Sequence, residues 1–121
     1  MGVEIQQINL QGTPSVVIDL DSDATSENNV NSGAATPYWF VIENGDSLKE
    51  YTKVWDNTAP TVGTTANDLS FMTQPDSTLT VGIDFGVSLG TALSFATVSD
   101  GGGTAGTTAP VGNVKVMVVT D

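Results

Sequence analysis

Alternation of apolar and polar side chains marks the clearest element of the chain, between residues 77 and 85. Four apolar residues fall on one side of an extended backbone and four small or polar residues on the other: Leu79, Val81, Ile83 and Phe85 against Thr78, Thr80, Gly82 and Asp84. This period of two is the pattern of a β-strand with one buried and one solvated face. We therefore predict a strand over 77–85, starting at a Pro75-Asp76 turn.

Further apolar runs predict strands elsewhere, at residues 3–10, 15–20, 36–43, 48–56, 68–74, 91–98 and 113–120. In the run at 15–20 we expect Val16, Ile18 and Leu20 to form the core face. The run at 36–43 is apolar at nearly every position, which is typical of a strand covered on both faces. The run at 113–120 is also apolar on both sides, so we expect it to be central in a sheet or covered by a neighbouring subunit.

Turn signals separate these runs. The Asn44-Gly45 dipeptide predicts a tight type I′ hairpin that pairs 36–43 with 48–56. Polar segments at 21–35, 57–67 and 100–112 are long connections, and long loops often carry recognition. A Gly-Thr-Thr-Ala sequence occurs at 63–66 and again at 106–109, but it is too short to establish a repeat. These signals predict a single all-β domain over residues 1–121, an antiparallel β-sandwich or jelly-roll-like fold of about eight strands.

Charge narrows the classes of partner. The chain has 14 acidic residues and three basic ones (Lys49, Lys53 and Lys115), for a net charge of −11. This balance argues against a nucleic-acid backbone or an anionic membrane as partner, since both attract Lys and Arg. The three lysines are isolated in the sequence, and we interpret each as a surface residue. We expect neither a signal peptide nor a membrane span, because there is no basic leader and no apolar stretch of 18 residues.

The sequence offers little for catalysis. It contains no His and no Cys, which removes the commonest general base, the commonest transition-metal ligand and every disulfide. No Gly-x-Ser-x-Gly elbow occurs, and the carboxylates show no catalytic spacing. The Gly101–Gly103 run lacks the following helix and the Lys of a phosphate loop, so we interpret it as a flexible loop. We predict no catalytic residue and no cofactor, and we expect that the protein is not an enzyme.

One acidic cluster resembles the beginning of a calcium loop. Asp19, Asp21 and Asp23 alternate as the first ligands of such a loop would. Ala24 stands where the motif needs Gly, however, and Val30 stands where it needs Glu. We therefore predict no metal site and keep the three aspartates as weak candidates.

The two tryptophans raise a choice between core and surface. Trp39 and Trp55 both fall on predicted strands, where large aromatic side chains usually pack in the core. Trp55 adjoins a turn-rich segment and has charged neighbours, so we predict that it is the more exposed to a partner. An alternative is a carbohydrate-binding module that uses Trp55 or Tyr51 as a stacking platform for a sugar ring.

Three stretches form recognisable motifs: Thr36-Pro-Tyr-Trp-Phe-Val-Ile42, Lys53-Val-Trp-Asp-Asn-Thr-Ala-Pro-Thr-Val-Gly63, and Leu79-Thr-Val-Gly-Ile-Asp-Phe-Gly86 with Leu89-Gly-Thr-Ala-Leu-Ser-Phe-Ala96. Through these motifs, about two thirds of the chain resembles a family of small virion accessory proteins of tailed phages. The Gly/Thr/Ala loop before the Val-rich strand, residues 104–120, matches as well. Ser70-Phe-Met-Thr73 departs from the usual aliphatic run, and the loop at 21–35 has no counterpart.

The resemblance implies a capsid decoration (cement) protein, which binds the outer capsid surface and stabilises it. The expected partners are the major capsid protein and further copies of the chain, for example in a trimer. The expected location is the virion surface, after assembly in the host cytoplasm. A tail, neck or fibre protein is the alternative within the same family. The interface residues that we predict are Trp55, Pro60, Val62, Val114, Val116 and Val118.

Overall fold

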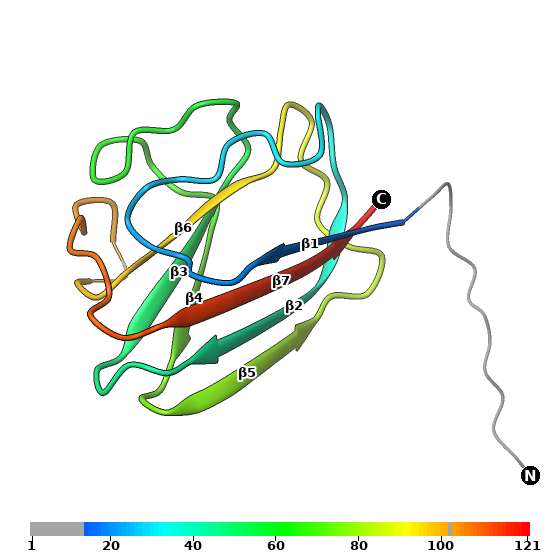
Figure 1. The fold of residues 1–121 in the computed structure, drawn as a ribbon. Coiled ribbons are helices and arrows are strands. Elements are labelled where there is room, and N and C mark those ends of the chain that lie inside the picture. The colour runs from blue at the N-terminus through cyan, green and yellow to red at the C-terminus, as the bar shows by residue number, and fades with distance from the viewer. Residues whose placement is uncertain (1–13, 102) are drawn as a thin grey trace, which may run out of the picture.

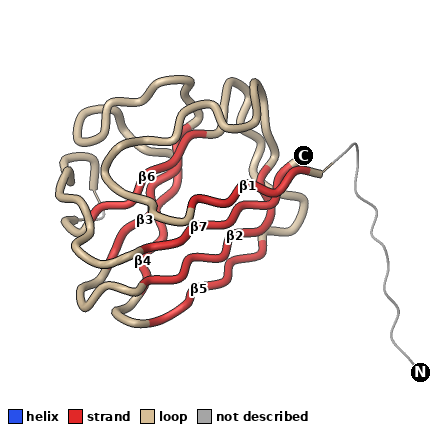
Figure 2. The backbone as a smooth tube through the Cα atoms, viewed as in Figure 1, coloured by secondary structure: helices blue, strands red, loops and turns tan. Residues whose placement is uncertain are grey.

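Seven β-strands in two antiparallel sheets make up the part of the chain that the computed structural model describes, residues 14–101 and 103–121. The four-stranded sheet has the order β1 (Ser15–Asp19), β7 (Val114–Thr120), β2 (Pro37–Asn44), β5 (Ser77–Gly82). The three-stranded sheet has the order β4 (Leu69–Thr73), β3 (Glu50–Trp55), β6 (Ser94–Val98). Figure 1 shows the two sheets as separate layers, and Figure 2 shows that all regular structure in the described residues is strand. The all-β prediction is confirmed. The strand predicted at 3–10 lies outside the described residues.

The core lies between the two sheets. Phe40, Ile42 and three valines of β7 face inward from the four-stranded sheet, while Val54 and Phe95 face them from the other sheet. The rings of Phe40 and Phe71 cross the layer with their centroids 4.9 Å apart. Strand β7 is central, between β1 and β2, as the sequence allowed.

The end of β5 departs from its predicted alternation. Leu79, Val81 and Ile83 pack against the core as predicted, but the strand ends at Gly82. Phe85 sits in the following turn with φ of 66° and is fully exposed. A bulky side chain at positive φ is strained, because its Cβ approaches the backbone carbonyl. The inward position that we predicted for Phe85 is therefore wrong.

Strand β1 shows the opposite face to the one predicted. It pairs with β7 so that Val17 lies opposite Val118 and packs on the core. Val16, Ile18 and Leu20 consequently face away from the core, with exposed fractions of 58%, 59% and 65%. The predicted core face of residues 15–20 is therefore wrong. A shift of one residue in register exchanges the two faces of a strand.

The Asn44-Gly45 turn is not a hairpin. It carries the chain from β2 in one sheet to β3 in the other, and these two strands do not pair with each other. The Asn44 amide donates to the carbonyl oxygens of Leu48, Thr73 and Gln74. A Cβ on Gly45 would lie 2.8 Å from the Asn113 carbonyl oxygen, so glycine is needed here for close approach and not for a positive φ.

The segment at 21–35 closes one side of the molecule. Ser22 N donates to Val114 O at 2.8 Å, which ties the segment to β7. Thr97 N donates to Asp23 O, and Glu27 forms an isolated β-bridge with Phe95. The segment therefore covers the otherwise open edge of β6 and is a structural connection between the two sheets.

Loops cover β3 and β6 on the outer face of the three-stranded sheet, whereas Ser70 and Met72 on β4 stay exposed. The Trp55 indole N–H donates to the Thr65 carbonyl oxygen at 2.9 Å, beneath the loop at 57–67. Lys53 is fully buried under the loop at 100–110, and its Nζ donates to the Gly103 carbonyl oxygen. Our interpretation of Lys53 as a surface residue is therefore wrong. The two Gly-Thr-Thr-Ala segments meet here, since a Cβ on Gly63 would collide with the Thr107 side chain.

Candidate docking surface

The outer face of the four-stranded sheet is the main candidate for a functional surface, because none of the described residues covers it. The strand registers place its side chains in rows across the sheet. The first row is Val16, Val119, Trp39 and Gly82; the second is Ile18, Met117, Val41 and Thr80; the third contains Lys115, Glu43 and Thr78. We call the first two rows the apolar face.

The apolar face is more exposed than a solvated sheet surface should be. Val16, Ile18 and Trp39 are 58%, 59% and 42% exposed, and Val41, Met117 and Val119 are half-buried beside them. Antiparallel sheets normally place polar side chains on a solvated face. A contiguous apolar surface of this kind is typical of a contact site.

Trp39 is held in place by the neighbouring strand. A Cβ on its cross-strand partner Gly82 would lie 2.9 Å from the indole Cζ3 atom, so the ring covers the glycine. Phe85 lies near the same end of the sheet, because Ile83 N and Val87 N flank it and donate to the carbonyl oxygens of Tyr38 and Pro37. Two large exposed aromatic side chains therefore stand where β2 begins.

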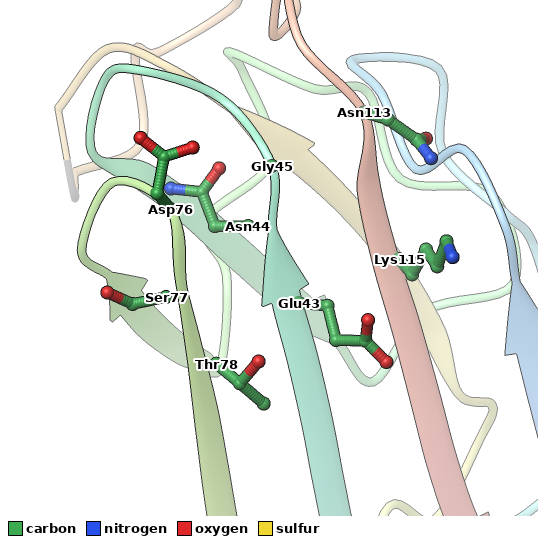
Figure 3. Close-up of a pocket in the computed structure, with 8 residues that line it drawn as sticks. All are labelled: Glu43, Asn44, Gly45, Asp76, Ser77, Thr78, Asn113 and Lys115. Atoms are coloured by element: carbon green, nitrogen blue, oxygen red, sulfur yellow. The ribbon is translucent and has the colours of Figure 1, made fainter.

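A polar groove borders the third row, near the turn at 44–45. Its volume is about 390 Å³ and its lining is drawn in Figure 3: Glu43, Asn44, Gly45, Asp76, Ser77, Thr78, Asn113 and Lys115. Figure 3 also shows Glu43 and Lys115 projecting from neighbouring strands. No aromatic side chain lines the groove, so it lacks a stacking surface.

A second groove, of about 520 Å³, lies between the end of β1 and the segment before β7. Leu20 and Val111 line it beside Asp21 and Asp23. Leu20 and Val111 are 65% and 92% exposed, so this groove adds apolar surface near the β1 edge of the apolar face.

Three aspartates fasten loops of the molecule by accepting backbone hydrogen bonds. Asp46 accepts hydrogen bonds from the backbone of Leu48, Val111 and Gly112. These backbone hydrogen bonds, the one from Gly112 N–H most of all, lower the pKa of Asp46. Asp56 accepts from the backbone of residues 90–92, and Asp100 accepts from Thr108 N. These bonds lower the pKa of both carboxyl groups too, the Ala92 N–H most for Asp56 and the Thr108 N–H most for Asp100.

Glu50 is a buried carboxyl group in the same region. It is fully buried, and both its oxygens accept from Ser99 Oγ, at 2.9 and 3.0 Å. Burial raises the pKa of Glu50 to about 7; nearby Asp46 adds to the rise, and Ser99 opposes it. Burial likewise lowers the pKa of Lys53, against the attraction of Asp100. Both groups lie under covering segments, away from the apolar face.

The residues that we predicted as interface residues lie mostly inside the chain. Trp55, Val114, Val116 and Val118 are at most 1% exposed, and Pro60 is also buried. Val62 is half-buried in the loop over the three-stranded sheet. Since five of these six side chains do not reach the surface, we move the expected contact region to the apolar face. The signal for that face was present in the sequence, where 36–43 and 113–120 are apolar on both sides.

The calcium-like aspartates form local turns. Asp19 Oδ1 accepts from Asp21 N, and Asp23 Oδ1 accepts from Thr25 N. Among residues 14–101 and 103–121, no three acidic side chains come together as a potential metal-binding group. Within the same residues, no helix is long and apolar enough to cross a membrane.

Comparisons with known proteins give no match. No protein-family model matches the chain, and no curated protein and no solved structure does either. The functional argument therefore depends on the residues and their arrangement.

Proposed function

We propose that the chain is a capsid decoration (cement) protein of a tailed phage, which stabilises the outer surface of the capsid without catalysing a reaction. In this proposal the two sheets form an antiparallel β-sandwich. The protein acts by adhesion: several copies bind the major capsid protein and bridge neighbouring capsomers, so that the pressure of the packaged DNA is shared.

The observation that carries the proposal is the apolar face, with Trp39 and Ile18 exposed at 42% and 59%. Such a face is expected to be covered in an assembly. The fastened loops support the same idea, since Asp46 and Asp56 each anchor a turn to a distant segment. The likeness of residues 36–100 to virion accessory proteins is the reason for proposing a phage capsid as that assembly.

The number of copies in a purified virion tests the proposal. A decoration protein is present in hundreds of copies, because it follows the lattice of the major capsid protein. We therefore expect hundreds of copies by quantitative mass spectrometry, with the major capsid protein as the internal standard. Six or twelve copies would instead place the chain in the tail, neck or fibre, and its absence from the particle would refute the proposal.

Trp39 favours a second candidate, a carbohydrate-binding module. The indole lies across Gly82 on an open sheet face, the arrangement of an aromatic platform that stacks on a sugar ring. Trp55 cannot serve this role because it is buried, and Tyr51 is half-buried on the other sheet. Binding on a glycan array that disappears in Trp39→Ala and persists in Met72→Ala would favour this candidate over decoration.

A further inference from the structure

We propose that a second copy of this chain covers the apolar face, so that two four-stranded sheets pack face to face about a two-fold axis. The axis runs along the strand direction, midway between β7 and β2. This inference does not depend on the proposed function. It follows from the order of the strands and from the side chains that the registers place on the face.

The charged side chains of the third row, beside the apolar face, are self-complementary under this axis. Lys115 on β7 and Glu43 on β2 are cross-strand neighbours in the third row. A two-fold axis between their strands places each Lys115 opposite the Glu43 of the other copy, which gives two reciprocal ion pairs. Within the three rows these are the only charged side chains, so the face has no net charge although the whole chain carries −11.

The shapes of the rows also complement each other. The same axis places β1 opposite β5, so the exposed Ile18 side chain faces the small Thr80 of the other copy. Val16 faces the position of Gly82, where the Trp39 ring of the other copy offers an apolar surface. Trp39 faces Val119 in the middle of the contact. Aligned packing of this type is common between antiparallel sheets.

The size of the face sets the expected affinity. A sheet four strands wide and about six residues long covers roughly 400 Å². A stable interface buries about 800 Å² on each partner. The dimer should therefore be weak unless neighbouring loops enlarge the contact.

Salt dependence distinguishes this dimer from docking onto a basic partner. Two copies with a charge of −11 each repel one another, and salt screens that repulsion. The dimer should become tighter as the salt concentration rises from 50 to 500 mM. Docking onto a basic protein would become weaker over the same range.

Sedimentation velocity of the full chain between about 10 µM and 1 mM tests the proposal. Ile18→Glu places a charge in the contact, and we expect it to weaken dimerisation at least about tenfold. Lys115→Glu should also weaken the dimer, and adding Glu43→Lys should restore it, because the exchanged pair keeps the net charge of the natural chain. Met72→Glu is the control, since Met72 is 40% exposed but lies on β4 of the other sheet.

A natural chain that stays monomeric up to 1 mM at 500 mM salt would overturn the proposal. So would a dimer that tolerates Ile18→Glu, or a charge exchange that does not restore association. Circular dichroism and thermal unfolding of each variant separate lost association from lost folding. A monomer that is nonetheless found in hundreds of copies per virion would overturn the dimer alone and leave the decoration role intact.

Discussion

At the scale of single residues, four acidic side chains differ in the protonation state that the fold favours. Asp46, Asp56 and Asp100 accept backbone hydrogen bonds in their ionised form, and this lowers their pKa values. Glu50 is buried beside Asp46, and burial raises its pKa to about 7. The three aspartates need their charge to fasten the loops, whereas Glu50 fits its site best when it is protonated.

Stability should therefore pass through a maximum in mildly acidic solution. The Glu50 contribution is complete below its unfolded pKa of about 4.5 and is lost as the pH rises through about 7, because the folded state holds the proton more tightly. The contributions of the three aspartates to stability are complete above their unfolded pKa of 3.8. They are lost as the pH falls through the lowered pKa values of the folded state. We expect urea midpoints to be highest near pH 5 and to decrease toward pH 8.

Glu50→Gln isolates the alkaline part of this profile. The glutamine amide resembles the protonated acid, so more than half of the decrease between pH 5 and pH 8 should disappear. The exposed Glu27 provides the control, and Glu27→Gln should keep the natural profile. If the urea midpoint of Glu50→Gln decreases between pH 5 and pH 8 as steeply as that of the natural chain, Glu50 is not the group responsible.

At the scale of elements, the passage from β2 to β3 determines how the two sheets are connected. Asn44 is 3% exposed, and its amide nitrogen donates to three carbonyl oxygens, of Leu48, Thr73 and Gln74. Its side-chain oxygen accepts from Asp46 N at 2.8 Å. One side chain thus joins the end of β2 to the turn between β4 and β5.

Asn44→Asp should destabilise the fold by about 3 kcal/mol or more, because the carboxylate oxygen that replaces the amide nitrogen would face three carbonyl oxygens and could donate to none of them. Asn57→Asp makes the same chemical change where only the acceptor is used, since Asn57 Oδ1 accepts from Ala59 N. That variant should stay within about 0.5 kcal/mol of the natural chain. Urea denaturation at pH 6 measures both, and equal effects at the two positions would contradict this role of Asn44.

The sequence predicted strands more reliably than their faces or partners. The runs at 36–43 and 113–120 correspond to Pro37–Asn44 and Val114–Thr120, because long apolar runs bounded by turn residues define strands well. The face of β1 was predicted wrongly because the alternation favours Val16, Ile18 and Leu20, whereas pairing with β7 turns the opposite phase, with only Val17 apolar, toward the core. The partner of β2 could not be predicted, because Asn44-Gly45 favours a hairpin locally and long-range bonds of Asn44 replace it.

The candidate site was predicted less well for the same reason. Trp55 looked more accessible than Trp39 from its neighbours, yet the loop at 57–67 covers Trp55 and none of the described residues covers Trp39. Coverage by a loop is a tertiary property and leaves no periodic signal in the sequence.

At the scale of the whole molecule, the two sheets differ in how far loops cover their outer faces. Loops at 57–67 and 100–110 lie over the three-stranded sheet, as Figure 1 shows beside β3 and β6. None of the described residues covers the outer face of the four-stranded sheet, where Trp39 and Ile18 are exposed. This asymmetry is the basis for expecting an assembly, with a second copy on the open face and the loops free to contact a capsid.

A reconstruction of the virion that contains this chain tests the central claim most directly. We predict density for the chain on the outside of the capsid shell, with the outer face of β1, β7, β2 and β5 covered and Trp39 buried in that contact. The chain bound elsewhere with this face open to solvent, or missing from the particle altogether, would contradict the claim.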